Sequence, residues 1–279
     1  MMQIDAHQHF WRYEAGEYGW IDESMAGIRR DFLPEHLKPL LGRVGIDGTV
    51  LVQVRQSLQE TRWMLELAEE NSFIAGVVGW VDLRSPGVRD ELELFRGQKK
   101  LVGIRHVVQG EPAGFLLRPD FLRGIAALQE FGLAYDILIY TPRLKEAAEF
   151  VAKFPGMRFV VDHLAKPPVK NGVVEEWARG IRELAAFPNV YAKLSGLVAE
   201  ADWAAWKAED FRPYFDVAFE AFGPKRLMIG SDWPVCLVGA SYQRAMEVVK
   251  DYLAAFSDPE RDAVMAGTAA EFWGLGNRK

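Results

Sequence analysis

The feature that most constrains the fold is an alternation between short apolar runs, rich in β-branched residues, and segments with apolar residues at helical spacing. The apolar runs begin near Gln3, Gly48, Ile74, Val102, Leu133, Arg158, Val190 and Arg226. Helical stripes occupy 121–128, 144–151, 177–184 and 214–222, and Gly132 is expected to cap the first of these helices. Strands that alternate with helices in this way indicate a parallel sheet.

Eight such units predict a closed barrel. The strand ends recur about every 32 residues, which is the length of a strand with its following helix. The chain of 279 residues is 49% apolar, which suits one barrel with a large core. We therefore expect a single (β/α)8 TIM barrel over residues 1–279, with a doubly wound sheet as the alternative.

Charge and cysteine content exclude several classes of partner. The net charge is −6 and basic residues occur only in short pairs, so neither nucleic acid nor an anionic membrane is an expected partner. Cys236 is the one cysteine and cannot form an internal disulfide. Neither a signal peptide nor an apolar run of about 18 residues is found near the start of the chain, so we expect a cytoplasmic protein. The sequence indicates no oligomeric state.

Polar residues stand at the carboxyl ends of most predicted strands, where TIM barrels carry their active sites. One polar residue at the end of a strand is commonly just exposed to solvent, but polar residues at six strand ends together indicate an active site. They are His7 and His9, Gln53 and Arg55, Arg105 and His106, Asp162 and His163, Lys193 and Ser195, and Asp232.

The stretch IDAHQHFW places two histidines two residues apart in the first strand. Because side chains alternate along a strand, Asp5, His7 and His9 should face the same side. His163 and Asp232 can reach the same barrel mouth from other strands. Imidazole and carboxylate ligands suit one divalent cation, above all Zn²⁺, and an open ligand position would make the site catalytic.

The sequence resembles the amidohydrolase superfamily over nearly its whole length. DAHQHFW is similar to the first-strand motif of that family, VVDHLAKP to the sixth, GSDWPV to the eighth, and GTAAEFWGL to a closing C-terminal helix. Within the superfamily it looks most like the sugar-lactonase branch, whose members open L-fuconolactone and L-rhamnonolactone. The resemblance implies hydrolysis of a small lactone, with His7, His9, His163 and Asp232 as the metal ligands.

One departure from the superfamily pattern bears on the number of metals. Many members carry a lysine or glutamate after the fourth strand and a histidine after the fifth, which supports two metals. Here Arg105 and His106 stand at the first place and Asp136 or Tyr140 at the second. The resemblance therefore implies one metal, or a metal that the reaction does not require.

Ester hydrolysis needs a base for water, a donor for the oxyanion and groups that hold the ring. We assign Asp232 as the base, acting on a water near His163 and the two N-terminal histidines, and Arg105, His106 or the metal as the oxyanion donor. Candidates for contact with the sugar are Gln53, Tyr140, Lys193, Trp20 and Trp233.

The loop after the first strand carries Trp11, Tyr13, Tyr18 and Trp20. It could cover the pocket, and at least two of these aromatic residues are expected to pack the loop onto the barrel. Two rival functions remain from sequence alone, namely decarboxylation of an aromatic or muconate-type acid and non-catalytic sugar binding.

Overall fold

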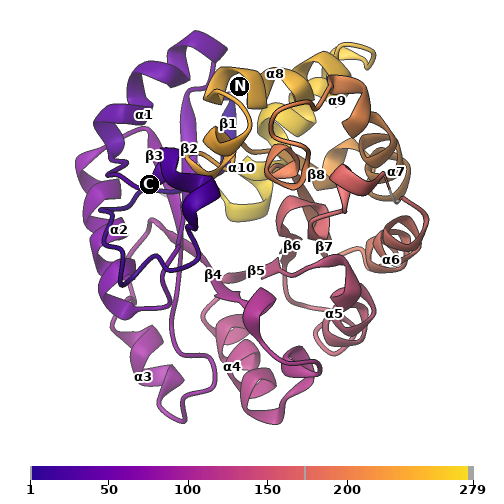
Figure 1. The fold of residues 1–279 in the computed structure, drawn as a ribbon. Coiled ribbons are helices and arrows are strands. Elements are labelled where there is room, and N and C mark those ends of the chain that lie inside the picture. The colour runs from indigo at the N-terminus through magenta and orange to yellow at the C-terminus, as the bar shows by residue number, and fades with distance from the viewer. Residues whose placement is uncertain (1, 173, 276–279) are drawn as a thin grey trace.

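The computed structural model describes residues 2–172 and 174–275, and its centre is an eight-stranded parallel sheet. The strands are β1 (Ile4–Gln8), β2 (Gly48–Val52), β3 (Ile74–Gly79), β4 (Leu101–Val107), β5 (Ala134–Leu138), β6 (Phe159–Val161), β7 (Val190–Leu194) and β8 (Leu227–Ile229). The Asp232 amide donates to the His7 carbonyl (2.8 Å) and the His9 amide to the Trp233 carbonyl (2.7 Å), so the sheet closes between β8 and β1. The predicted (β/α)8 barrel is confirmed, and the doubly wound alternative is wrong (Figure 1).

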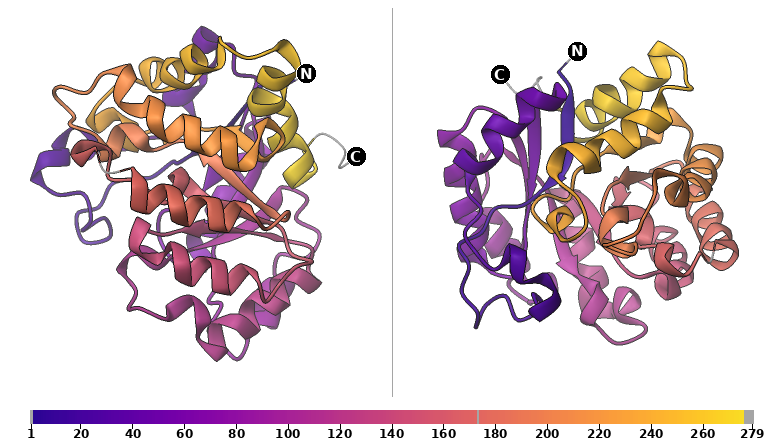
Figure 2. Two further views of the ribbon diagram at one scale, coloured as in Figure 1. Left: turned by 90° about the vertical axis from the view of Figure 1, so that its right-hand side faces the viewer. Right: turned by 45° about the horizontal axis from the view of Figure 1, so that its top comes forward.

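Helices follow the strands and surround the barrel, as Figures 1 and 2 show. They are α1 (Pro34–Leu41), α2 (Leu58–Glu70), α3 (Val88–Glu93), α4 (Pro119–Glu130), α5 (Leu144–Val151), α6 (Glu175–Ala185), α7 (Arg212–Phe222), α8 (Tyr242–Leu253), α9 (Asp258–Asp262) and α10 (Thr268–Trp273). The four predicted helical stripes correspond to α4, α5, α6 and α7. Gly132 follows α4 with a φ of +70°, as expected of a helix-ending glycine.

β1 departs from strict alternation, because its register against β2 shifts after Asp5. Ala6 packs in a cluster to which all the strands and α10 contribute, and this cluster fills the barrel interior. Asp5 instead accepts a hydrogen bond from the Tyr242 hydroxyl (3.2 Å) at the start of α8. The prediction that Asp5 shares a face with His7 and His9 is therefore wrong, since the irregular register reverses the alternation between them.

α10 closes the amino-terminal end of the barrel. Phe272 and Trp273 pack against residues near the starts of the strands, such as Ile4, Ala134 and Met228. This packing confirms the C-terminal closing helix that the family resemblance implies. With this end filled by apolar side chains, the opposite end is the one that can hold a polar site.

The β1–α1 connection is a long loop whose two ends are joined by backbone hydrogen bonds. The Trp11 and Phe32 backbones form two reciprocal hydrogen bonds of 2.9 Å. Trp11 and Tyr18 are buried, whereas Trp20 is 44% exposed. The expectation that at least two loop aromatics pack onto the barrel is therefore confirmed.

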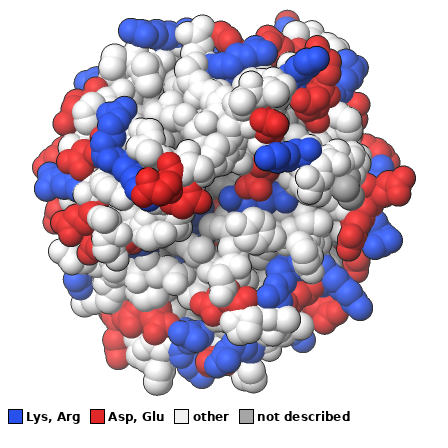
Figure 3. Space-filling view, viewed as in Figure 1, with Lys and Arg blue, Asp and Glu red and all other residues white. Residues whose placement is uncertain are grey.

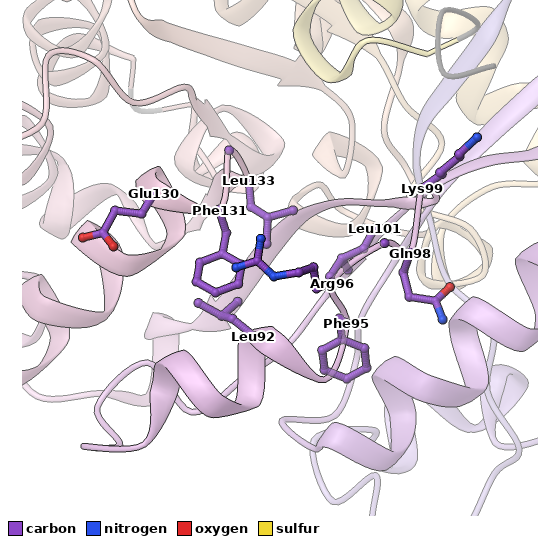
Figure 4. Close-up of a pocket in the computed structure, with 11 residues that line it drawn as sticks. Leu92, Phe95, Arg96, Gln98, Lys99, Leu101, Glu130, Phe131 and Leu133 are labelled. Atoms are coloured by element: carbon purple, nitrogen blue, oxygen red, sulfur yellow. The ribbon is translucent and has the colours of Figure 1, made fainter.

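One cavity, of about 450 Å³, lies between the end of α3 and the α4–β5 connection (Figure 4). Its lining includes Leu101, the first residue of β4, and Leu133, which precedes β5. The cavity therefore belongs to the amino-terminal end of the strands, away from the end where barrel active sites lie.

The surface carries both signs of charge. Figure 3 shows acidic and basic side chains interspersed over the visible face, without an extended area of one sign. Among the residues that the structure describes, no helix has the length and apolar character needed to cross a membrane.

Candidate active site

Three histidine side chains surround one carboxylate oxygen at the carboxyl ends of β1, β6 and β8. The Oδ1 atom of Asp232 lies 3.3 Å from His9 Nε2. It lies 3.7 Å from His163 Nε2 and 3.8 Å from His7 Nε2. The Nε2 atoms of His7 and His9 are themselves 3.1 Å apart. The four residues that the sequence indicated as convergent are thus all buried around one point.

The backbone takes unusual conformations to bring these side chains together. His163 and Asp232 have φ values of +52° and +58°, which cost non-glycine residues about 1–2 kcal/mol each. Two glycines make room for the rings. A Cβ at Gly196 would lie 2.4 Å from His163 Nδ1, and one at Gly230 would lie 2.9 Å from His7 Cβ. Only glycine is therefore compatible with the observed ring positions.

The other ring nitrogen of each histidine is held by a separate partner. His9 Nδ1 donates to the Val52 carbonyl (2.7 Å), and because that carbonyl can only accept, the lone pair of His9 is on Nε2. His163 Nδ1 lies 2.8 Å from Ser195 Oγ. Contacts of this kind fix ring orientation and tautomer, and here they direct the Nε2 atoms toward Asp232.

His7 is held by a buried network of charges. Its Nδ1 lies 3.3 Å from Asp162 Oδ1 and 3.2 Å from Lys193 Nζ. Lys193 also pairs with Asp136 and, at 2.8 Å, with Asp162. Arg105 Nη1 lies 2.9 Å from Asp162 Oδ2 and 3.3 Å from His7 Nε2. Asp162, Lys193 and Arg105 therefore contact the His7 ring directly, and Asp136 holds Lys193 in place.

Burial decides the protonation of the histidines. It lowers the pKa of His163 to about 4, and it lowers the pKa of His7 and His9 below their ordinary value as well. For Asp232, burial acts to raise the pKa, but the nearby imidazoles, His163 foremost, hold it below its ordinary value. At neutral pH the site thus presents uncharged imidazoles to a charged carboxylate.

These residues fit one divalent cation. Neutral imidazole and carboxylate are ligands that zinc prefers, and in a tetrahedral site with bonds of about 2.0–2.1 Å the ligand atoms lie about 3.4 Å apart. The separations among His7, His9 and Asp232 are 3.1, 3.3 and 3.8 Å. Those three residues have ligand atoms close enough to share an ion, with His163 beside them.

A second cation has fewer free ligands. Asp162 is near His7 and His163, but its charge is already balanced by Arg105 and Lys193. Asp136 is one of the two residues at the place where many superfamily members carry a histidine for a second metal, and here it pairs with Lys193. Asp162 and Asp136 are therefore less available to a metal than Asp232 is.

Arg105 and His106 face opposite sides of β4. Arg105 points to His7, whereas His106 Nε2 lies 2.9 Å from Glu111 Oε1 and its ring stacks on Phe115 at 4.8 Å between centroids. Adjacent residues of a strand alternate in this way. The expectation that His106 serves as an oxyanion donor is corrected by this placement, and we retain Arg105 alone.

Gln53 and Lys193 are both fully buried. The ammonium of Lys193 is bound by carboxylates, so its place is to position His7, and this replaces the expected contact with sugar. Gln53 Nε2 donates to the Arg105 carbonyl (3.2 Å), while Gln53 Oε1 is buried without a hydrogen-bond partner. Gln53 thus retains a free acceptor beside Arg105.

The aromatic candidates divide by exposure. Tyr140 and Trp20 are 45% and 44% exposed. Trp20 lines a cavity of about 600 Å³ together with Arg55 at the end of β2. Trp233 is buried against Phe32, with ring centroids 5.1 Å apart, and therefore packs the loop rather than presenting a free face.

Sequence reasoning did not single out Lys166 and Glu200. The Lys166 Nζ atom lies 2.9 Å from Glu200 Oε1 and 5.6 Å from the Tyr140 ring centroid. The available signal was the place of Lys166 three residues after His163. The four residues from His163 to Lys166 all have positive φ although none is glycine, and no sequence pattern predicts such a turn.

The comparisons with known proteins agree with this architecture. The model of the Amidohydrolase family matches residues 4–275. L-fucono-1,5-lactonase from Burkholderia multivorans is 42% identical, over 98% of this chain and 96% of its own, and L-fucono-1,5-lactonase from Burkholderia ambifaria is 39% identical, over 84% and 80%. A crystal structure of an amidohydrolase from Burkholderia multivorans with bound Zn is 42% identical and matches with a TM-score of 0.95, over 99% of this chain and 100% of that one. The chain therefore belongs to the Amidohydrolase family.

Proposed function

We propose that the protein hydrolyses the ester bond of a small sugar-acid lactone such as L-fucono-1,5-lactone. The observation that carries the proposal is the position of Asp232 Oδ1 within 3.8 Å of three imidazole nitrogens, where a water can be both held and deprotonated. The two L-fucono-1,5-lactonases at 42% and 39% identity support a sugar lactone as the substrate.

Asp232 is the general base in this mechanism. Its charged carboxylate takes a proton from the water as the water oxygen bonds to the lactone carbonyl carbon. The bond from that carbon to the ring oxygen then breaks, and Asp232 returns the proton to the departing ring oxygen. The product is the open-chain sugar acid. His163 orients the water from one side, because Ser195 fixes its ring.

Arg105 stabilises the negative charge that develops on the carbonyl oxygen. Its Nη1 atom lies 3.3 Å from His7 Nε2, next to the place of the water, and only 3% of the residue is exposed. A guanidinium remains charged at any working pH, and a donor in a buried site loses little strength to solvent. Gln53 is fully buried and its Nε2 donates to the Arg105 carbonyl, so it supports the backbone that carries Arg105.

A zinc ion held by His7, His9 and Asp232, with His163 beside it, would lower the pKa of its water and polarise the lactone carbonyl. The amidohydrolase from Burkholderia multivorans that was crystallised with Zn supports this choice of metal. The chain supplies neutral nitrogens for it, because burial keeps these imidazoles unprotonated.

The test is a panel of five- and six-membered aldonolactones, assayed by proton release with and without a chelator. An aromatic carboxylic acid in the same panel checks the decarboxylase alternative. We expect turnover of a six-carbon or deoxy-sugar lactone and none of the acid. Decarboxylation without hydrolysis of any lactone would contradict the proposal.

A further inference from the structure

We propose that Lys166 and Glu200 form a clamp for two neighbouring hydroxyl groups of the lactone ring, against the face of Tyr140. The inference rests on the proposed function and deepens it, since it names the residues that make the site prefer a hydroxylated ring to a plain lactone.

The clamp is a cation and an anion held side by side. Lys166 Nζ and Glu200 Oε1 are 2.9 Å apart, and the two side chains are 16% and 21% exposed. Both side chains are therefore mostly shielded from water, but neither is fully buried. An ammonium can only donate hydrogen bonds and a carboxylate can only accept them. Adjacent sugar hydroxyls, which do both, match this pair.

The aromatic side of the clamp is Tyr140, which follows β5. Tyr140 and Trp20 are both exposed, and Tyr140 lies beside the charged pair, with Lys166 Nζ 5.6 Å from its ring centroid. An exposed aromatic face offers apolar contact to the C–H side of a sugar ring while the polar groups bind its hydroxyls. Tyr140 thus supplies a platform next to the charged pair.

The clamp is attached to the elements that hold His163. Lys166 ends the turn that begins at His163, and the Lys166 amide donates to the His163 carbonyl (2.8 Å). Glu200 ends the short helix Leu197–Glu200, just after Ser195, which bonds to the His163 ring. Both arms of the clamp are therefore fixed relative to the reacting groups.

The turn from His163 to Lys166 is strained. Its φ values are +52°, +51°, +59° and +49°, a conformation that costs each non-glycine residue free energy. The Thr141 hydroxyl holds it by donating toward the Ala165 and Lys166 carbonyls, at 3.3 and 3.1 Å. A single, partly exposed ion pair contributes too little stability to account for four strained residues. The turn instead holds Lys166 next to His163 at the carboxyl end of β6, the end of the barrel that carries the proposed site.

The experiment compares a hydroxylated with an unsubstituted ring. We would measure kcat and KM of the metal-loaded wild type, Lys166→Met and Glu200→Gln with L-fucono-1,5-lactone and with δ-valerolactone, which has the same ring without hydroxyls. Lys170→Met, at an exposed lysine near Lys166, is the matched control. Methionine keeps the length of lysine and adds no new strain at φ +49°.

For L-fucono-1,5-lactone we expect kcat/KM to fall about ten- to hundredfold in Lys166→Met and Glu200→Gln, mainly through KM, because a hydrogen bond to a charged group is lost. For δ-valerolactone the change should stay within about threefold, and Lys170→Met should resemble the wild type with both substrates. Equal losses on the two lactones, or no loss on either, would overturn the clamp.

A second arm separates the clamp from the reaction. If the wild type hydrolyses neither lactone, the proposed function fails, and calorimetric titration with L-fucose, a hydroxylated ring without an ester, then decides the clamp. Binding at least tenfold weaker in Lys166→Met than in the wild type would uphold it. Equal affinity, or no binding by either protein, would reject it.

Discussion

The Asp232 amide donates a 2.8 Å hydrogen bond to the His7 carbonyl, and the side chains of the same two residues meet at 3.8 Å between Oδ1 and Nε2. The contact that closes the barrel between β8 and β1 is therefore also the contact that builds the site. Gly230 lies beside this seam, where a Cβ would come within 2.9 Å of His7 Cβ. The geometry of the site therefore depends on the same β8–β1 contact that closes the barrel.

The opposite directions of Arg105 and His106 predict unequal effects on catalysis. Arg105→Gln should lower kcat/KM for the lactone at least about 100-fold, since it removes a buried donor to the oxyanion. His106→Asn should lower it less than about tenfold, because His106 contacts Glu111 and Phe115 outside the site. The measurement is steady-state kinetics on both variants. Equal losses would place His106 back among the catalytic groups.

Metal content should depend on His9 and not on an exposed histidine. We expect His9→Asn to retain at least about tenfold less zinc than the wild type after equilibration at limiting metal, because one ligand nitrogen is lost. His36→Asn, at an exposed position of α1, should bind as the wild type does. Elemental analysis after gel filtration gives the stoichiometry. Full zinc content in His9→Asn would rule out the assigned ligand set.

Lys193 should stabilise the folded protein, because it is the cation that two buried carboxylates share. Lys193→Met leaves Asp136 and Asp162 buried without their shared cation, so we expect a loss of about 3 kcal/mol or more in the free energy of unfolding. Burial already raises the pKa of Asp136 to about 7, so Asp136→Asn should be milder. The double variant Lys193→Met/Asp136→Asn should lose about 1 kcal/mol or more less than the sum of the two single losses in the free energy of unfolding, measured with urea. Strict additivity would show that the pair is not coupled.

Glu60 predicts a pH dependence of stability. It is buried on α2 and accepts hydrogen bonds from the Val54 and Arg55 amides, at 3.0 and 2.8 Å. Burial raises its pKa from 4.5 to about 7. Since the folded protein holds this proton more tightly than the unfolded chain, the stabilisation is complete below pH 4.5 and is lost as the pH rises to about 7.

Glu60→Gln stays uncharged throughout this range. Between pH 5 and pH 8 its free energy of unfolding should therefore fall by about 2–3 kcal/mol less than that of the wild type, measured by urea unfolding. Glu69→Gln, an exposed position on the same helix, is the control and should follow the wild type. Parallel pH profiles for Glu60→Gln and the wild type would refute the buried-proton explanation.

The barrel could be predicted from the sequence because its pattern is repeated. Each apolar run and each helical stripe is a local signal, and α4 with Gly132 and α5 occur where the periodicity indicated. The irregular register of β1 could not be predicted, because it depends on pairing with β2. That irregularity turned Asp5 to the outside while His7 and His9 face the site.

The site was only partly accessible to sequence reasoning. Strand ends indicated which residues to gather, and strand alternation alone could have separated Arg105 from His106. The roles of Lys193 and Lys166 could not be read in this way. The role of Lys193 depends on one carboxylate in β5 and one directly after β6. The role of Lys166 depends on a left-handed turn whose residues have no sequence preference for that conformation.

The proposed mechanism requires Asp232 as the base, and Asp232→Asn tests this role. Asparagine keeps the size of the side chain but removes the charge and the proton acceptor. We expect kcat for the lactone to fall at least about 100-fold with a smaller change in KM. Because Asp232 is also a proposed zinc ligand, the metal content of both proteins is measured and matched before the rates are compared. A folded Asp232→Asn protein that keeps the wild-type metal content and hydrolyses the lactone at a near wild-type rate would contradict the mechanism.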